Sequence, residues 1–366
     1  DGKLFLREQG DLFAYKLRAG ARSIPSSAPT TVGPEFTGLV RLGASVKLVS
    51  PKSAESRLRM FNFAVIDEQS PVPVIALSDR HVAADGTLSE AVVKELRQLK
   101  SVFILDFAGS RIGSEGIRQV ARLASLVGLS IGVCRQVDDA ALESLADATG
   151  LRVLVATGTS IGPAGLAHVA DLPSLVALDL EVCDNVSDSA CDVLGRMTKL
   201  RALNLKKTAF EKDRISAAGL KKLASLQQLE LLNLDADSIN DEALKELKPF
   251  RNLRELDLSL TSVSDAGLKH LTSLEKLANL TLLYSEGFAG PKITNAGLKS
   301  ISQMAQLQTL NLVGAKIDDA GVDDLAMLRN LKQLSLVGSG VSVDGLSRLR
   351  MALPNCHLKA DHEPRK

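Results

Sequence analysis

One pattern of apolar residues recurs ten times along the 366-residue chain, at intervals of 24 to 30 residues. Its clearest copy is Leu253–Leu268, LRELDLSLTSVSDAGL, with apolar residues at positions 1, 4, 6, 11 and 16. The copies begin at Val102, Leu126, Leu151, Leu175, Leu200, Leu229, Leu253, Leu277, Leu307 and Leu331. An eleventh copy, with an insertion of six residues, is predicted at Val72. Such regularity predicts a stack of similar units.

Each unit is predicted to contain one strand and one helix. The opening LxxLxL alternates as a short strand with one buried face does, and stretches such as DAGLKHLTSL (265–274) then follow helical spacing. Gly113 and Gly162 follow position 11 in two copies. In the other eight, this residue has a side chain that can cap a helix: Asp138, Ser187, Ser216, Asn240, Ser264, Thr294, Asp318 and Ser342.

A single unit cannot fold alone. About six buried apolar side chains at ~2 kcal/mol each do not offset the ordering of one unit, at ~1 to 2 kcal/mol per residue. Neighbouring units must therefore stack, strand beside strand and helix beside helix. The predicted fold is an α/β solenoid over residues 71–366, a curved arc with a parallel sheet on its concave face and helices on its convex face. Leu353–Asp361 is predicted to close it with a half unit and a charged tail.

Residues 1–70 do not follow the pattern. KLFLREQGDLFAYKL (3–17) suggests a hairpin around Gly10 and Asp11, and residues 22–34 have the composition of a linker. Two strand-like runs follow at 45–50 and 59–66. These features predict a small β-rich N-terminal cap. The remnant of an adjacent domain is the alternative, and the sequence does not decide between them.

Charge and hydropathy limit the class of partner. Forty-four Lys and Arg residues against forty-three Asp and Glu give a net charge of +1, which argues against a general nucleic-acid or anionic-membrane binder. The longest apolar runs fall well short of the ~20 residues that span a bilayer, so no membrane insertion is expected. We expect a cytoplasmic monomer, although a chain that begins at Asp1 leaves a leader or anchor upstream open.

The repeats resemble those of the leucine-rich-repeat family, over about three quarters of the chain. The motifs SDAGL (264–268), TNAGL (294–298), DDAGV (318–322) and SAAGL (216–220) are similar to its cysteine-containing, ribonuclease-inhibitor-like branch and to bacterial tandem DAGL-type repeats. The resemblance implies a binding scaffold with polar side chains at position 9 that bond the inner turn, a ladder that Ala315 breaks. Of the four widely spaced cysteines, Cys134, Cys183 and Cys191 occupy inward positions and are predicted to be buried and reduced.

The candidate partner site lies on the concave face, where positions 3, 5, 7 and 8 point away from the core. A mostly acidic stretch crosses its central strands, and two insertions, Ala209–Arg214 and Glu286–Lys292, bring aromatic residues to one rim. The predicted partner-binding residues are Asp179, Glu181, Asn204, Lys206, Phe210, Asn233, Asp235, Asp257, Tyr284 and Phe288. Two simpler explanations stay open: that the strand surface is polar only for solubility, and that each aromatic folds back over its own insertion.

No recognised catalytic or phosphate-binding motif occurs, and the five histidines lie in different elements. No metal or cofactor is therefore expected. Because an open strand surface has no water-excluding pocket, raised carboxyl pKa values are not expected either. The sequence predicts a non-catalytic scaffold that binds a protein. The alternative is the recognition region of a larger enzyme or receptor, such as a kinase or a ubiquitin-ligase substrate receptor; no convincing F-box is evident.

Overall fold

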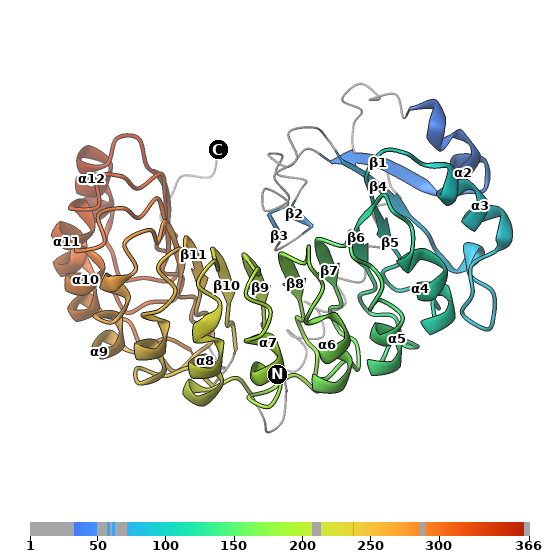
Figure 1. Cartoon of the computed structure of the whole chain (residues 1–366). Coiled ribbons are helices and arrows are strands. Elements are labelled where there is room, and N and C mark those ends of the chain that lie inside the picture. The colour runs from blue at the N-terminus through green and yellow to red at the C-terminus, as the bar shows by residue number, and fades with distance from the viewer. Residues whose placement is uncertain are drawn as a thin grey trace.

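The computed structural model describes residues 33–49, 72–206, 214–236, 238–285 and 290–361, together with the backbone of 57–58 and 61–62. These residues form a curved arc whose strands line the inner side and whose helices line the outer side (Figure 1). The arc is the predicted α/β solenoid. In Figure 1 the colours run in order from blue to red along the arc, because each unit stacks on the one before it in the chain.

A 13-stranded sheet forms the concave face, in the order β1-β4-β5 and then strand by strand to β15. Every pair from β4 onward is parallel, while β1 is antiparallel to β4. The strands are β1 Ser45–Val49, β4 Val72–Ala76, β5 Phe103–Asp106, β6 Leu126–Ser130, β7 Val153–Val155, β8 Ala177–Asp179, β9 Ala202–Asn204, β10 Leu231–Asn233, β11 Glu255–Asp257, β12 Asn279–Thr281, β13 Thr309–Asn311, β14 Gln333–Ser335 and β15 His357–Lys359.

Short helices return the chain along the convex face. The α-helices are α2 Thr37–Arg41, α3 Glu90–Gln98, α4 Ser114–Ala121, α5 Asp139–Glu143, α6 Pro163–Val169, α7 Cys191–Leu194, α8 Ala217–Lys222, α9 Asp265–Leu268, α10 Asn295–Ile301, α11 Val322–Ala326 and α12 Val343–Ala352. The 3-10 helices are η1 Pro34–Phe36, η4 Asp79–His81, η5 Leu223–Ser225, η6 Ala243–Leu247, η7 Leu271–Ser273 and η8 Asp319–Gly321.

Equivalent repeat positions stand side by side in the sheet. At position 4, Leu232 pairs with Leu256, and Leu256 with Leu280, and all three side chains are buried in one continuous core. The eleventh copy is confirmed in the same way, because Ile75 pairs with Leu105. At the other end β15 continues the register, as predicted for the closing half unit. The apolar pattern thus determines both the strand positions and their alignment.

The predicted capping residues stabilise the strand-to-helix turns. The side chains of Asp138, Ser216, Ser264, Thr294, Asp318 and Ser342 each accept a hydrogen bond from an amide of the first helical turn. Ser187 and Asn240 differ from these six. Ser187 Oγ accepts from the Ser189 amide, before α7 begins, and Asn240 Oδ1 accepts from the amide of Ala243, the first residue of the 3-10 helix η6. The capping residues also connect neighbouring units. A carboxylate near the start of the helix in one unit accepts a hydrogen bond from the backbone amide of the capping residue in the next unit. Ser264 N donates to Asp241 Oδ1 at 2.7 Å, for example.

The N-terminal region packs directly on the first unit. Strand β1 confirms the predicted run at 45–50, but helix α2 was not predicted. Phe36 and Leu39 are buried in the same core as Leu96 of α3, so residues 33–49 cover the end of the solenoid as a cap would. Of the predicted strand at 59–66, only β3 Phe61–Asn62 is described, paired with β2 Arg57–Leu58. The predicted hairpin around Gly10 and most of the linker lie outside the described residues.

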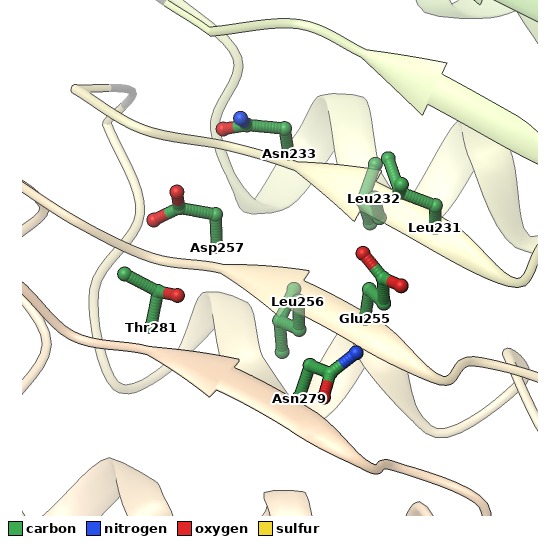
Figure 2. A pocket seen from close by; sticks show the side chains of 8 residues that line it. All are labelled: Leu231, Leu232, Asn233, Glu255, Leu256, Asp257, Asn279 and Thr281. Carbon is green, nitrogen blue, oxygen red and sulfur yellow. The ribbon is translucent and has the colours of Figure 1, made fainter. Parts of the chain in front are cut away.

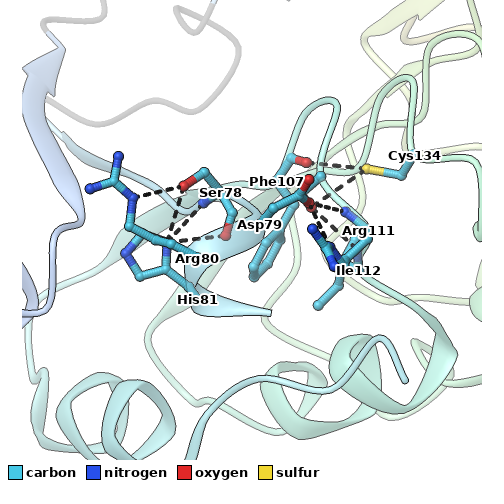
Figure 3. A network of polar contacts seen from close by, with 9 residues as sticks. Ser78, Asp79, Arg80, His81, Phe107, Arg111, Ile112 and Cys134 are labelled. Atoms are coloured by element: carbon cyan, nitrogen blue, oxygen red, sulfur yellow. Dashed lines mark hydrogen bonds and ion pairs between the residues drawn. The ribbon is translucent and has the colours of Figure 1, made fainter. Parts of the chain in front are cut away.

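Position 9 places sulfur and hydroxyl groups inside the strand-side turns. Cys134 Sγ lies 3.1 Å from the carbonyl oxygen of Phe107 in the preceding unit, as Figure 3 shows, and Cys183 Sγ lies 3.2 Å from that of Ala156. Thr159 Oγ1 donates to the same Ala156 carbonyl at 2.6 Å. Cys134, Cys183 and Cys191 are free and buried, as predicted. These side chains give hydrogen-bond partners to carbonyls of the buried strand-side turns; the Phe107 carbonyl also accepts from the Ser110 amide.

Position 8 adopts a left-handed backbone conformation in eight units. Glycine fills it at Gly109, Gly158, Gly314 and Gly338, where no Cβ opposes a positive φ. The other four units place Val133, Val182, Ala236 and Leu260 there, with φ between 54° and 65°. A β-branched residue in this region is strained by ~1 to 2 kcal/mol. The exposed Val133 is therefore a position where strain is not offset by packing.

Replacing Val133 with asparagine should stabilise the fold by about 1 kcal/mol, because asparagine tolerates a positive φ and the valine side chain is 56% exposed. Chemical denaturation of the two proteins measures the difference. The matched control is Val343→Asn, at an equally exposed valine in α12 where no positive φ occurs. Equal effects at the two positions would contradict the assignment of strain to Val133.

Candidate functional site

The centre of the concave face carries a connected set of polar side chains from four adjacent strands. Asp179 ends β8, Asn204 ends β9 and Asn233 ends β10. Glu181, Lys206 and Asp235 each lie two residues beyond the end of the same strands. Asp257 ends β11. They occupy positions 5 and 7 of their units, which the parallel register brings into two rows. The structure therefore brings together seven of the ten predicted site residues.

Lys206 is the cation of this polar centre. Its Nζ lies 3.0 Å from Asp235 Oδ2 and 3.8 Å from Glu181 Oε1. Asn204 extends the network, because its Nδ2 donates to Asp179 Oδ1 at 3.0 Å and lies 3.4 Å from Glu181 Oε2. One ammonium thus lies among several carboxylates.

The acidic centre is buried more deeply than an open strand surface would be. Asn204 is fully buried, Asn233 is 3% exposed, and Asp179 and Asp235 are 5% and 6% exposed. Glu181, Lys206 and Asp257 are partly buried. The polar residues closest to the middle of the arc are consequently poorly available to a partner, whereas Asp257, on the C-terminal side, can be reached.

A second apolar cluster extends from this centre toward the N-terminal end, on the sheet face opposite the helices. Position 3 carries Val74, Ile104, Val153, Ala177 and Ala202 there, and each is at most 7% exposed. At the same position the C-terminal strands carry polar side chains, from the partly buried Glu255 of β11 to the exposed Gln333 of β14. Figure 1 shows the β2–β3 hairpin on this side of the sheet. The concave face therefore has a covered half and an open half, which we define as β10 to β14.

Burial changes the acidity of two central carboxyls, contrary to the sequence-based expectation. Desolvation raises the pKa of Asp179 to about 7. It outweighs the hydrogen bonds from the Glu181 amide and from Asn204, which lower the pKa, and the Glu181 charge adds a smaller increase. Desolvation, together with the Asp235 charge, raises the pKa of Asp257 to about 6. Burial opposes the charge of Lys206, but the carboxylates of Asp235 and Glu181 outweigh this and raise its pKa. The expectation was wrong because the central strand surface is not open to water.

A depression lies in the open half beside the acidic centre, with a volume of about 150 Å³. In Figure 2 Asn233, Asp257 and Thr281 form one row across three strands, and Leu231, Glu255 and Asn279 form the other. Leu232 and Leu256 complete its lining. The rows are positions 5 and 3 of consecutive units, so the depression combines acidic and amide groups with an apolar wall.

The rim predicted from the insertions is described only in part. Phe210 and Phe288 lie outside the described residues. Tyr284 is partly buried, and its ring lies so close to Gly290 and Gly314 that added Cβ atoms would come within 2.7 Å and 3.2 Å of ring atoms. The tyrosine thus packs against its own rim, which favours a structural role for this aromatic.

The strand-side turns of the first units form another polar network. Asp79 Oδ1 accepts the Arg111 backbone amide at 2.7 Å and lies 3.4 Å from the Arg111 Nε (Figure 3). His81 is 3% exposed, with Nδ1 near Ser78 and no hydrogen-bond partner for Nε2 among the described residues. The contact between Asp79 and Arg111 joins the first two units.

The described residues contain neither a cluster of metal-ligand side chains nor a helix that could span a membrane. Among the described residues, no three His, Cys, Asp or Glu side chains gather as a metal ion would require. No helix in the described part of the chain is long and apolar enough to cross a membrane.

Comparison with known proteins supports the fold. Residues 251–272 and 305–326 match a family described as leucine-rich repeat. No curated protein sequence matches the chain. An internalin from Listeria monocytogenes is similar in structure, with 18% identity and a TM-score of 0.50 over 93% of this chain and 100% of that one. A leucine-rich-repeat protein of Leptospira interrogans (19%, TM-score 0.48, 75% and 69%) and internalin C2 of L. monocytogenes (22%, TM-score 0.45, 68% and 91%) are also similar.

Proposed function

We propose that this leucine-rich-repeat solenoid is a binding scaffold that holds a protein partner on the open half of its concave face. The observation that carries the proposal is the arrangement of β10 to β14, where successive strands present side chains at regular spacing without a covering element among the described residues. Acidic and amide groups lie at one end, and Leu283, Val313 and Val337 lie partly exposed at the other. A surface with a polar end and an apolar end is suited to an extended protein surface.

Burial argues against a catalytic role for the central carboxyls. Asp179 has the pKa of a general acid near neutrality, but it is 5% exposed and already accepts hydrogen bonds from Asn204 and the Glu181 amide. A general acid must reach a substrate atom within hydrogen-bonding distance. Asp179 has no such access, so we assign it to the framework of the binding surface.

The alternative proposal is that the scaffold is the recognition region of a larger enzyme or receptor, such as a kinase or a ubiquitin-ligase substrate receptor. The same surface would then select the substrate. We also propose that the repeats are of the cysteine-containing, ribonuclease-inhibitor-like type. The support for this subtype is local: the sulfur and hydroxyl groups at position 9 bond the carbonyls of the strand-side turns.

Two variants test where a partner binds. Thr309→Arg combined with Ser335→Arg adds bulk and charge to partly buried positions of the open half. Lys269→Glu combined with Lys299→Glu changes exposed residues on the convex face. Proteins captured from the native host by the unaltered chain are purified and measured by surface plasmon resonance. We expect the concave variant to weaken binding at least about tenfold, which is about 1.4 kcal/mol. The convex variant should bind as the unaltered chain does.

Thermal unfolding of both variants establishes that they are folded before binding is compared. Binding that is lost in the convex variant and kept in the concave one would overturn the proposal. A partner that binds all three proteins equally would contradict it as well, because the open half would then play no part.

A further inference from the structure

Helices α3 and α4 of the first two units border a groove on the convex face, away from the open half of the concave face (Figure 1). The α3 side supplies Arg97, in the last turn of that helix. The α4 side supplies Glu115, Arg118, Arg122, Leu123 and Ala124. The groove has a volume of about 520 Å³, which lies within the range of sites that hold small organic ligands.

The lining of this α3–α4 groove is positively charged, although the whole chain is almost neutral. Three arginines against one glutamate give the lining a formal charge of +2, whereas the 366 residues together carry +1. Two charged side chains beside the lining offset each other. They are the exposed Lys94, one helical turn before Arg97, and Asp147, whose carboxylate accepts from Arg122 at 2.9 Å. The excess of positive charge is therefore local to the groove.

The arginines keep hydrogen-bond donors for a ligand, because each guanidinium carries five of them in one plane. Arg118 directs Nη1 to Glu115 Oε2 at 2.6 Å, and Arg122 directs Nε and Nη2 to Asp147 Oδ2. Arg97 has no hydrogen bond or ion pair with any described residue. The two ion pairs are exposed to water, where such pairs are weak, so they do not prevent the arginines from turning to an anion with more charge.

A phosphate monoester matches the groove in charge and in acceptors. It carries a charge of about −1.5 to −2 near neutral pH and three terminal oxygens, so it balances the lining and can accept from three arginines at once. A carboxylate or a phosphate diester has a single charge and balances only half of the excess. Leu123 is partly buried and gives the groove an apolar wall for the carbon skeleton of a ligand.

We propose that the α3–α4 groove binds the phosphate group of a phosphorylated organic ligand. Arg97, Arg118 and Arg122 each donate to the phosphate oxygens, and the organic part of the ligand lies against Leu123. A phosphorylated protein side chain and a small phosphorylated compound share this chemistry. The site is separate from the open half of the concave face, so it does not rest on the proposed function.

The probe is methyl phosphate, a monoester, and dimethyl phosphate is the diester control. Titration of the full chain is followed by the NMR shifts of the Leu123 and Ala124 amides. We expect methyl phosphate to bind saturably with a Kd of about 1 mM or less. Dimethyl phosphate has one charge fewer and should bind at least about tenfold more weakly.

Three variants test the residues of the groove. Arg97→Gln removes the unpaired cation and should weaken methyl phosphate at least about tenfold. Glu115→Gln removes the only carboxylate of the lining and should strengthen it, because Arg118 then has no competing anion. The matched control is Arg348→Gln, at an exposed arginine of α12 that is also paired with a carboxylate, that of Asp323. It should leave the affinity unchanged.

Thermal unfolding establishes that the three variants are folded. Absence of methyl phosphate binding, equal affinity for the two esters, or equal weakening by Arg97→Gln and Arg348→Gln would overturn the proposal, since the last two results indicate diffuse attraction to a positive surface. Weaker binding by Glu115→Gln would contradict it as well.

Two further compounds distinguish the sources of the phosphate. N-acetyl-O-phosphoserine methylamide represents a phosphorylated protein, and glycerol 3-phosphate represents a small phosphorylated compound. Whichever binds more tightly than methyl phosphate identifies the source and supports the proposal. Neither outcome depends on what the open half of the concave face binds.

Discussion

Replacement of Ile104 by aspartate is expected to lower the free energy of unfolding by about 4 kcal/mol or more. Ile104 lies at position 3 of β5, on the face opposite the helices, and is 4% exposed. Its side chain leans over Gly128 of the next strand, where an added Cβ would come within 2.8 Å of Ile104 Cγ1. The substitution would remove a buried apolar group and place a carboxylate among valines and alanines, with a desolvation cost in addition to the cavity.

The same substitution at Gln333 should change stability by no more than about 0.5 kcal/mol. Gln333 occupies the same repeat position in β14, but its side chain is exposed. Urea denaturation of both variants gives the two free energies, and their difference measures how far the covered half is closed to water. Similar small losses at the two positions would mean that the N-terminal half of the concave face is open after all, and that a partner has access to all of it.

The apolar repeat is sufficient to predict the arc, because the residues at its inward positions serve only to be buried in the core. A residue such as Leu256 must be apolar to be buried between neighbouring units, and its recurrence shows where every strand lies. The capping residues were predictable for a related reason, since Ser264 or Thr294 satisfies a local amide whatever the rest of the molecule does. Both features depend on contacts within a unit or with the next one.

The candidate site depends on contacts that alternation alone does not describe. The alternation predicts exposed side chains at positions 5 and 7, because these positions point away from the core, yet Asn204 and Asp235 are buried. The sequence does contain the missing signal at position 3, where Val74, Ile104 and Val153 are apolar on a face that was expected to be polar. Apolar residues at this position in successive strands predict that the N-terminal half of this face is covered. The same residues do not predict which segment covers the face, because a segment outside the repeats does not follow the repeat pattern and cannot be aligned with the strands.

Asp179→Asn is expected to stabilise the protein by up to about 4 kcal/mol at pH 8. The pKa of Asp179 is raised from 3.8 to about 7 in the folded state, mainly by burial. Each pKa unit corresponds to about 1.4 kcal/mol, so ionising this carboxyl in the folded protein costs roughly that total. Asparagine avoids the cost and keeps the oxygen that accepts from the Glu181 amide at 2.8 Å and from Asn204 at 3.0 Å.

The sign of the pH dependence follows from the direction of the shift. Below about pH 4 the carboxyl is protonated in both the folded and the unfolded chain, and it contributes no pH dependence. Between about pH 4 and about pH 7 the unfolded chain releases its proton and the folded chain retains it, so the contribution to stability falls as pH rises. Above about pH 7 the loss is complete. The stability difference between Asp179→Asn and the unaltered chain should therefore be small at pH 4, grow through this window and level off near pH 8.

Urea denaturation at pH 4, 6 and 8 measures that difference, with Asp344→Asn as the control for loss of an exposed carboxylate. The control should follow the unaltered chain at each pH. A difference for Asp179→Asn that is constant with pH would show that this carboxyl ionises normally, and the polar centre would then be wetter than the structure indicates. A stabilised variant, by contrast, would mean that the chain retains a buried carboxylate at a cost in stability. Such a cost is compatible with the place of Asp179 in the framework of the proposed binding surface, because a protein that is selected for binding is not optimised for stability alone.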